Sequence, residues 1–381
     1  MHPAAGGPPV VVEKLASLMP LKGWEASVIT TSLYCNDDGQ TLLESIGQKI
    51  DLKVLPERWP RFMKRFRRAA EEIDEALKHA DLVHLHTLWN PLNTIARKAC
   101  QRHGLKYVLM PHGMLDPYSL RQKRWRKKIY LAAVERRNIQ EASRLIFTTN
   151  QEQESARKCL PWLGSGEVIA LGADYPPDLS REACIETFAR QFPQALDRRC
   201  LLFLGRIHQK KGLERLLTIL PQVTQKHPDI LLVIAGTGEP RYVESIKSLV
   251  NTLGLERQVL FTGMLTGYAK YGALALADAF LLPSKQENFA IAMAEAMQMA
   301  VPIIISNKVD SWPLVREANA GFVVEEKQIE TGFAERIDEM LYHPQEARRL
   351  GKCGQDFARE HLTWKRVAEA MVRLYQRVLA E

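Results

Sequence analysis

The chain has little of what marks a disulfide-bonded, metal-binding or membrane-spanning protein. Its six cysteines are scattered, with no Cys-x-x-Cys pair and no Cys/His cluster at the spacing of metal ligands. No apolar run approaches the ~20 residues that cross a bilayer, and no signal peptide is recognisable. An Asp-x-Asp motif is also missing. These absences predict a cytoplasmic protein with reduced thiols, and we expect no metal and no cofactor.

The length and the turn signals predict two domains. A chain of 381 residues is too long for one ordinary core. Apolar runs alternate with amphipathic segments, which indicates parallel α/β sheets. The stretch 172–180 is rich in proline and aspartate and is the predicted linker. We therefore expect an N-terminal domain over 1–175, a C-terminal domain over 176–362 and a final helix over 363–381.

The most informative segment places two carboxylates, Glu287 and Glu295, eight residues apart between the apolar runs 279–284 and 301–306. A strand, a loop, a helix start and a second strand form a βαβ unit, whose ligand site lies at the carboxyl ends of the strands. Helical geometry would separate the carboxylates by about 12 Å, which suits two parts of one elongated ligand and is too wide for one metal. The helix start between them favours a diphosphate. The alternative is a surface helix that carries two glutamates by chance.

A second motif lies upstream, where the apolar run 201–204 breaks at Gly205 and presents Arg206. Lys211 and Gly212 then open an amphipathic helix. A guanidinium and an ammonium five residues apart at a strand-to-helix turn can hold phosphate oxygens between them. This pair is a weak signal by itself, because basic residues flank many helices.

The Gly-Arg/Lys pair followed about eighty residues later by Glu-x7-Glu resembles the retaining, nucleotide-sugar-dependent glycosyltransferases of family 4. The resemblance covers nearly the whole chain. It implies a GT-B fold, with two Rossmann-like domains facing a cleft that holds the active site and a C-terminal helix that crosses back to the first domain. It also implies transfer of a hexosyl group from a UDP-sugar, UDP-glucose-like, to an acceptor hydroxyl with retention.

The resemblance also implies roles for individual residues. Arg206 and Lys211 should neutralise the leaving diphosphate, Glu295 should bind the ribose, and Glu287 the hydroxyls of the sugar. The family usually has Gly-Phe-Gly after the first glutamate, whereas this chain has Asn288-Phe289-Ala290, in which the alanine still allows close backbone approach. The other substrate-binding candidates of this half are Gly205, Gly236, Met264, Leu265, Asn288, Phe289, Ala290 and Ile291.

In the first half, three predicted strands end in polar loops. His112 precedes a glycine at one such end and is the catalytic candidate there, since the resembling family often has histidine or arginine at this place. His86 and Trp89 are acceptor-side candidates, although a lone histidine is more often structural. Gly6 and Gly7 precede a predicted helix over 10–18 and could approach a ligand, or belong to a flexible tail. Proteins that resemble this one have an apolar first strand before this loop, and that strand is missing here. Three explanations stay open: the start codon was assigned too late, the chain was trimmed, or the sheet lacks this central strand.

The net charge of +8 is concentrated in two segments, 58–68 and 121–130, which interleave cations with aromatic residues. This pattern suits an anionic membrane surface, a polyanionic acceptor or a solvated helix face. Nucleic acid is not an expected partner, because no binding module accompanies the charge. A membrane surface would fit a peripheral enzyme of exopolysaccharide or lipopolysaccharide synthesis with a lipid-linked glycan acceptor. A nucleotide-sugar epimerase and a non-catalytic membrane-associated binder are the remaining alternatives.

Overall fold

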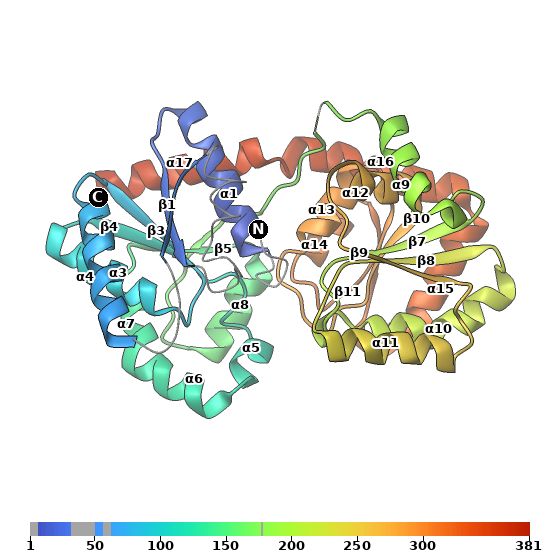
Figure 1. The fold of residues 1–381 in the computed structure, drawn as a ribbon, viewed down its shortest axis with the longest axis horizontal. Helices are drawn as coiled ribbons and strands as arrows, with labels where there is room; N and C mark the ends of the chain where they lie inside the picture. Colours follow the sequence, from blue (N-terminus) through green and yellow to red (C-terminus); the bar gives the residue numbers. More distant parts are fainter. Residues whose placement is uncertain (1–6, 32–49, 56–61, 177) are drawn as a thin grey trace. The chain divides into compact units, whose positions relative to one another are not determined.

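The computed structural model describes residues 7–31, 50–55, 62–176 and 178–381. It divides into two compact units, one formed by Met1–Leu171 with Trp364–Glu381 and the other by Gly172–Thr363. Each unit contains parallel strands covered by helices (Figure 1). The predicted α/β fold class is therefore confirmed.

The first unit holds a four-stranded parallel sheet in the order β3-β4-β5-β6 and a separate parallel pair, β1-β2. The buried face of β4 and β5 contributes Tyr107, Leu109 and Phe147 to the core. The last helix, α17, belongs to this unit, and its Tyr375 hydroxyl lies 2.7 Å from His84 Nδ1 on β3. The strands are β1 Ser27–Thr31, β2 Asp51–Leu55, β3 Leu82–His86, β4 Lys106–Met110, β5 Arg144–Phe147 and β6 Glu167–Val168; the helices are α1 Pro8–Leu18, α3 Phe62–Leu77, α4 Pro91–His103, α5 Pro117–Arg121, α6 Arg124–Tyr130, α7 Arg136–Gln140, α8 Asn150–Cys159 and α17 Trp364–Ala380.

The second unit holds a six-stranded parallel sheet in the order β12-β11-β10-β7-β8-β9. Helices α10 and α11 lie on one face of this sheet and α9, α12 and α13 on the other (Figure 1). Because both faces are covered, strands such as β8 are apolar and buried along their whole length. The strands are β7 Arg199–Leu204, β8 Ile230–Ala235, β9 Val259–Gly263, β10 Ala277–Leu282, β11 Ile303–Ser306 and β12 Gly321–Val324; the helices are α9 Arg181–Gln191, α10 Leu213–Lys226, α11 Pro240–Thr252, α12 Gly267–Leu276, α13 Ile291–Gln298, α14 Trp312–Glu317, α15 Ile329–Tyr342 and α16 Pro344–His361.

Candidate active site

The strand order of the second unit defines where a ligand would bind. From the neighbours β7 and β10, the chain continues to β8 and β9 on one side and to β11 and β12 on the other. The point between β7 and β10, where the strand order reverses, is called the switch point. Ligands of open α/β sheets bind there, beside the carboxyl ends of the strands. Gly205 and Arg206 follow β7, and Pro283 follows β10. The sequence candidates 205–211 and 287–295 therefore lie at the switch point.

Glycines allow three neighbouring strand ends to approach each other closely. The Gly205 N–H donates to Ala235 O at 2.9 Å, and the Gly236 N–H donates to Gly263 O at 2.7 Å. A Cβ on Gly236, whose φ is +156°, would stand 1.9 Å from Gly205 O. A larger residue at 236 would therefore force these backbones apart and disturb the turn that carries Arg206.

The turn before α10 is fixed against the loop after β10. Gly212 has φ +65°, and a Cβ there would meet Pro283 O at 2.5 Å. The Lys285 N–H donates to Lys210 O at 2.7 Å, and Lys210 Nζ lies 2.9 Å from Gln286 Oε1. These contacts bring the cationic turn of the first motif beside the loop that contains Glu287.

Lys211 and Glu287 form an ion pair whose side chains are 16% and 20% exposed. The ammonium of Lys211 also lies 3.8 Å from the position of a Cβ on Gly205. Glu287 is held by backbone hydrogen bonds to the chain beyond β11, since its N–H donates to Lys308 O and its carbonyl accepts from the Asp310 N–H. The two motifs, about eighty residues apart in the sequence, are thus in direct contact in the structure.

The turn after β7 is electrically positive. Arg206 is exposed at its start. Burial, together with the charges of Arg206, Lys210 and Lys211, lowers the pKa of His208 below its usual value. The three cations around this imidazole form a cluster of positive charge that can attract an anion.

The ~12 Å separation expected for the two glutamates rested on a helix that contains both of them, and that premise is wrong. Helix α13 begins only at Ile291, so Glu295 is helical and Glu287 lies in the preceding loop. Ala290 precedes the helix with φ 58° and ψ 70°. This left-handed conformation prevents the helix from extending back towards Glu287. The first N–H groups of α13 have no acceptor within the helix, and the anion seat expected at 289–291 stays a prediction.

Lys270 was not among the sequence candidates, yet it contacts one of them. Its ammonium lies 2.7 Å from Glu295 Oε1 and 4.7 Å from the centre of the Tyr271 ring. Burial opposes the charge on Lys270, but the Glu295 carboxylate raises the pKa of Lys270 above its usual value. The signal in the sequence was that Lys270 is the only charged residue of α12.

The substrate-binding candidates Met264 and Leu265 follow β9 at the same edge of the sheet. Met264 is 51% exposed, whereas Leu265 is buried. They share this edge with Gly236, whose N–H is bonded to Gly263 O at the end of β9.

In the first unit, three histidines adjoin one another, two on β3 and one in the turn after β4. His86 Nδ1 lies 2.9 Å from His112 Nε2, and the rings of His84 and His86 stack with centroids 4.0 Å apart. Burial lowers the pKa of all three, that of His86 to about 4. His112 is therefore a neutral imidazole at pH 7, able to donate or accept a hydrogen bond but carrying no charge.

The glycine pair at the start of the chain is only partly described. Gly6 lies outside the described residues. Gly7 has φ −72°, and its carbonyl accepts from Val10 and Val11 at the start of α1. This conformation does not require glycine, so the structure gives no backbone reason for its presence.

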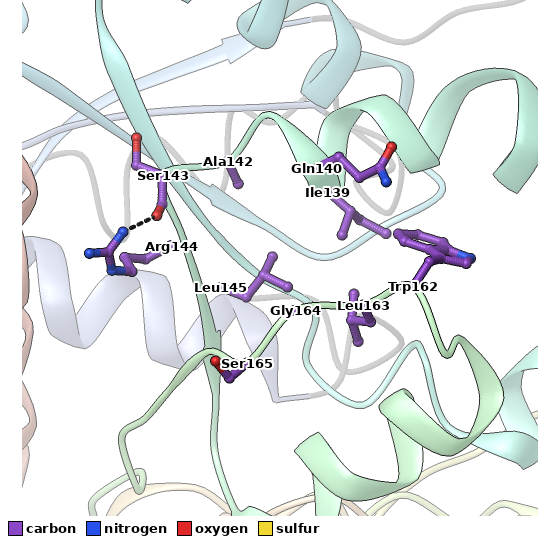
Figure 2. Close-up of a pocket in the computed structure, with 10 residues that line it drawn as sticks. All are labelled: Ile139, Gln140, Ala142, Ser143, Arg144, Leu145, Trp162, Leu163, Gly164 and Ser165. Carbon is purple, nitrogen blue, oxygen red and sulfur yellow. Dashed lines mark hydrogen bonds between the residues drawn. The ribbon is translucent and has the colours of Figure 1, made fainter.

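A cavity of about 580 Å³ opens in the first unit, but it belongs to neither group of candidates. Figure 2 shows it beside Ser143 to Leu145, at the amino end of β5, with Trp162 opposite. Arg144 turns back to donate to Ser143 O and pairs with Glu381. His86 is the last residue of β3 and His112 follows β4, both at the carboxyl ends of the strands, so this cavity is not their site.

The described residues contain neither a membrane-spanning helix nor a cluster of metal ligands. No helix in that part of the chain is long and apolar enough to cross a membrane. Among the same residues, no group of three or more histidine, cysteine, aspartate and glutamate side chains is arranged to hold a metal ion.

Comparison with known proteins matches both halves of the chain. Residues 185–357 match the family Glycosyl transferases group 1, and residues 6–163 match the Glycosyl transferase 4-like domain. The alpha-maltose-1-phosphate synthase of Mycolicibacterium smegmatis is 26% identical over 318 residues, or 79% of this chain and 80% of that protein. Two further curated relatives are matched over 49% and 47% of their own length, so the chain spans about half of them.

Solved structures share the fold at low sequence identity. Sucrose-phosphate synthase from Thermosynechococcus elongatus superposes with a TM-score of 0.81 at 22% identity, over 98% of this chain and 94% of that one. Anabaena Alr3699/HepE, in complex with UDP and glucose, gives 0.77 at 18% identity, over 97% and 96%. Both solved structures therefore share the fold of this chain over nearly its whole length.

Proposed function

The chain belongs to the group 1 glycosyltransferases, and from this premise we propose that it transfers a hexosyl group from a UDP-sugar to an acceptor hydroxyl with retention at the anomeric carbon. The observation that carries the proposal is the meeting of Lys211, Glu287 and the start of α13 at the switch point of the second sheet. Retention is included because the family-4 resemblance implies it. UDP is chosen because a structural neighbour was solved with UDP and glucose.

In this proposal the cations and the helix start hold the diphosphate. Negative charge develops on the diphosphate as it leaves. Arg206, Lys211 and the N–H groups of 289–291 would stabilise this charge. Lys211 is paired with Glu287, so the diphosphate would compete for its ammonium. The Glu287 carboxylate would then accept hydrogen bonds from the sugar hydroxyls, while Glu295 accepts from the ribose.

The acceptor side is assigned to the first unit, with His112 as its catalytic candidate and His86 and Trp89 beside it. An imidazole kept neutral by burial can orient a hydroxyl or a sugar oxygen without adding a charge. We propose a glycan or lipid-linked glycan as the acceptor, in exopolysaccharide or lipopolysaccharide synthesis.

The proposed membrane partner is an anionic lipid surface that contacts α6. Trp125 and Ile129, one helical turn apart, are 73% and 69% exposed, and Arg124, Arg126 and Lys128 around them are exposed cations. Apolar anchors among cations suit the headgroup region of such a surface. Of the other basic segment, residues 58–61 lie outside the described residues.

The direct test of the function is a thermal-shift screen of nucleoside diphosphates followed by a transfer assay. UDP at about 100 times its dissociation constant should stabilise the protein by about 2.7 kcal/mol. Arg206→Ala and Lys211→Ala should each cut turnover by about 100-fold or more, with EDTA leaving the wild-type rate largely intact. Lys226→Ala, which removes an exposed cation from the far end of α10, is the matched control.

Two outcomes would contradict the proposal. Conversion of the UDP-sugar in the absence of any acceptor would point to an epimerase. Wild-type turnover in either cation variant would contradict the assignment of Arg206 and Lys211 to the leaving-group site.

A further inference from the structure

Two fully buried glutamates of the first unit hold the backbone of the loops that follow β3 and β4. Glu135 is 0% exposed and accepts the Trp89 N–H at 2.6 Å, and Glu152 is 2% exposed and accepts the Gly113 N–H at 2.6 Å. A buried carboxylate that accepts a backbone N–H forms a stronger bond than a neutral acceptor. Both loops lie on the carboxyl side of the sheet, where α/β proteins bind ligands.

The residues beside these hydrogen bonds have strained backbones. Thr87, Trp89 and His112 adopt φ of 65°, 64° and 54°, which non-glycine residues rarely do. Such a conformation is unfavourable for a residue with a side chain and persists only when its surroundings fix it. Buried carboxylates hold Trp89 directly and His112 through the next residue, Gly113.

The sequence around Glu152 predicts a different bond from the one observed. Thr149-x-x-Glu152 is a capping-box pattern, in which the glutamate returns to the backbone N–H of the cap residue. Thr149 does cap α8, since its side chain accepts from the Glu152 N–H at 3.0 Å. The carboxylate, however, accepts from the Thr148 N–H at 2.7 Å, from the Thr148 hydroxyl at 2.8 Å, and from Gly113 across the sheet.

We propose that Glu152 is a positioning residue for His112: it ties the turn after β4 to the end of β5 and so fixes the imidazole in the orientation that acts on the acceptor. Glu135 does the same for the loop 87–89. This inference rests on the proposed function, because that function assigns these loops to the acceptor. Glu152 itself touches no reacting atom and acts through His112.

Glu152→Gln is the decisive variant, because it keeps the size of the side chain and removes one acceptor. The carboxamide must point its NH2 group at Gly113 or at Thr148, both of which are donors. We expect the turn to shift and transfer to fall by about 100-fold, the scale of a 1 Å misplacement. UDP affinity, a property of the second unit, should stay within about twofold. Glu154→Gln, an exposed position on the same helix, is the matched control.

The second readout does not depend on activity. In protein labelled with ¹³C at histidine, the His112 resonance is identified by its loss in His112→Gln. In the wild type and in Glu154→Gln it should stay at its neutral position down to low pH, because burial lowers the pKa of His112. In Glu152→Gln it should titrate at higher pH or split into several signals.

Identical His112 titrations in Glu152→Gln and the wild type would overturn the positioning role, whatever the rates. Should Glu152→Gln fail to fold, Thr148→Val removes one donor to the same carboxylate and should give the same changes at smaller size. A wild type that transfers no sugar while Glu152→Gln alters the His112 resonance would refute the proposed function and leave Glu152 as the residue that positions His112. Loss of UDP affinity equal to the loss of transfer would show a general structural defect and contradict the inference.

Discussion

The ammonium of Lys270 on α12 and the carboxylate of Glu295 on α13 are 2.7 Å apart, and the two side chains are 21% and 18% exposed. Lys270 also lies over the ring of Tyr271, whose hydroxyl donates to Asp174 O at 3.0 Å. Glu295 is therefore held by a charged partner that is itself packed in place. A carboxylate fixed in this way supports the proposed role of Glu295 as the acceptor of hydrogen bonds from the ribose.

Lys270→Met should weaken UDP binding by about tenfold or more, because removing one member of a mostly buried ion pair leaves the other charge without compensation. Lys270→Arg keeps the charge and should lose less. The measurement is isothermal titration calorimetry, with Lys285→Met as the control, since that lysine pairs with Glu214 at a more exposed position. Equal UDP affinity in Lys270→Met and the wild type would remove Lys270 from the donor site.

The two glutamates should respond differently to the same neutral substitution. Glu295→Gln should weaken binding of UDP and of the UDP-sugar alike, because the ribose is common to both. Glu287→Gln should leave UDP affinity nearly unchanged and reduce transfer from the complete donor. Calorimetry with UDP and initial rates with the UDP-sugar separate these effects. If both variants lost UDP affinity to the same extent, the division of roles would be wrong.

Ala290→Gly should stabilise the second unit. Ala290 has φ 58° and is 7% exposed, and a left-handed conformation costs an alanine roughly 1–2 kcal/mol. After the extra freedom of glycine in the unfolded chain is subtracted, a gain of about 1 kcal/mol is expected, or about 2–4 °C in Tm. The control is Ala296→Gly inside α13, which should lower Tm, since glycine in a helix interior costs about 1 kcal/mol. A fall in Tm for both variants would contradict the account of Ala290.

The sequence predicted those parts of the fold and of the site that depend on nearby residues. The apolar runs of β7, β8 and β10 are buried on both faces, so they can be recognised as strands from the sequence. The polar residues that follow them mark the edge of the sheet where a ligand binds. The helical spacing of Glu287 and Glu295 was wrong because a left-handed residue at 290 delays the helix. The contacts of Lys270 with Glu295 and of Gly113 with Glu152 join residues 25 and 39 positions apart, and no local pattern determines them.

The stability of the first unit should fall as the pH is lowered from about 6.5 towards 4. In the folded protein burial lowers the pKa of His84, His86 and His112, that of His86 to about 4, whereas histidines of the unfolded chain titrate near 6.5. Between these values the unfolded state binds more protons, so acid favours unfolding, and above pH 6.5 the contribution is constant. Thermal melting at pH 7.5 and 5.0 measures this. His86→Gln should reduce the difference in Tm between the two pH values, while His343→Gln, at an exposed position, should not.

Binding of the chain to anionic vesicles should depend on the exposed face of α6. Each cation near such a surface contributes on the order of 1 kcal/mol, screened over ~8–10 Å by physiological salt. Lys127 is excluded from the test because it donates to Ser119 O and stacks on Trp89. Neutralising Arg124, Arg126 and Lys128 to glutamine should therefore reduce co-sedimentation with anionic liposomes at low salt. The double variant Trp125→Ser with Ile129→Ser should reduce the fraction of vesicle binding that persists at high salt.

The control changes the net charge equally at three exposed cations of α16, Arg348, Arg349 and Lys352. Binding that ignores lipid charge and salt, or that falls equally in the control, would make 121–130 an ordinary solvated helix face.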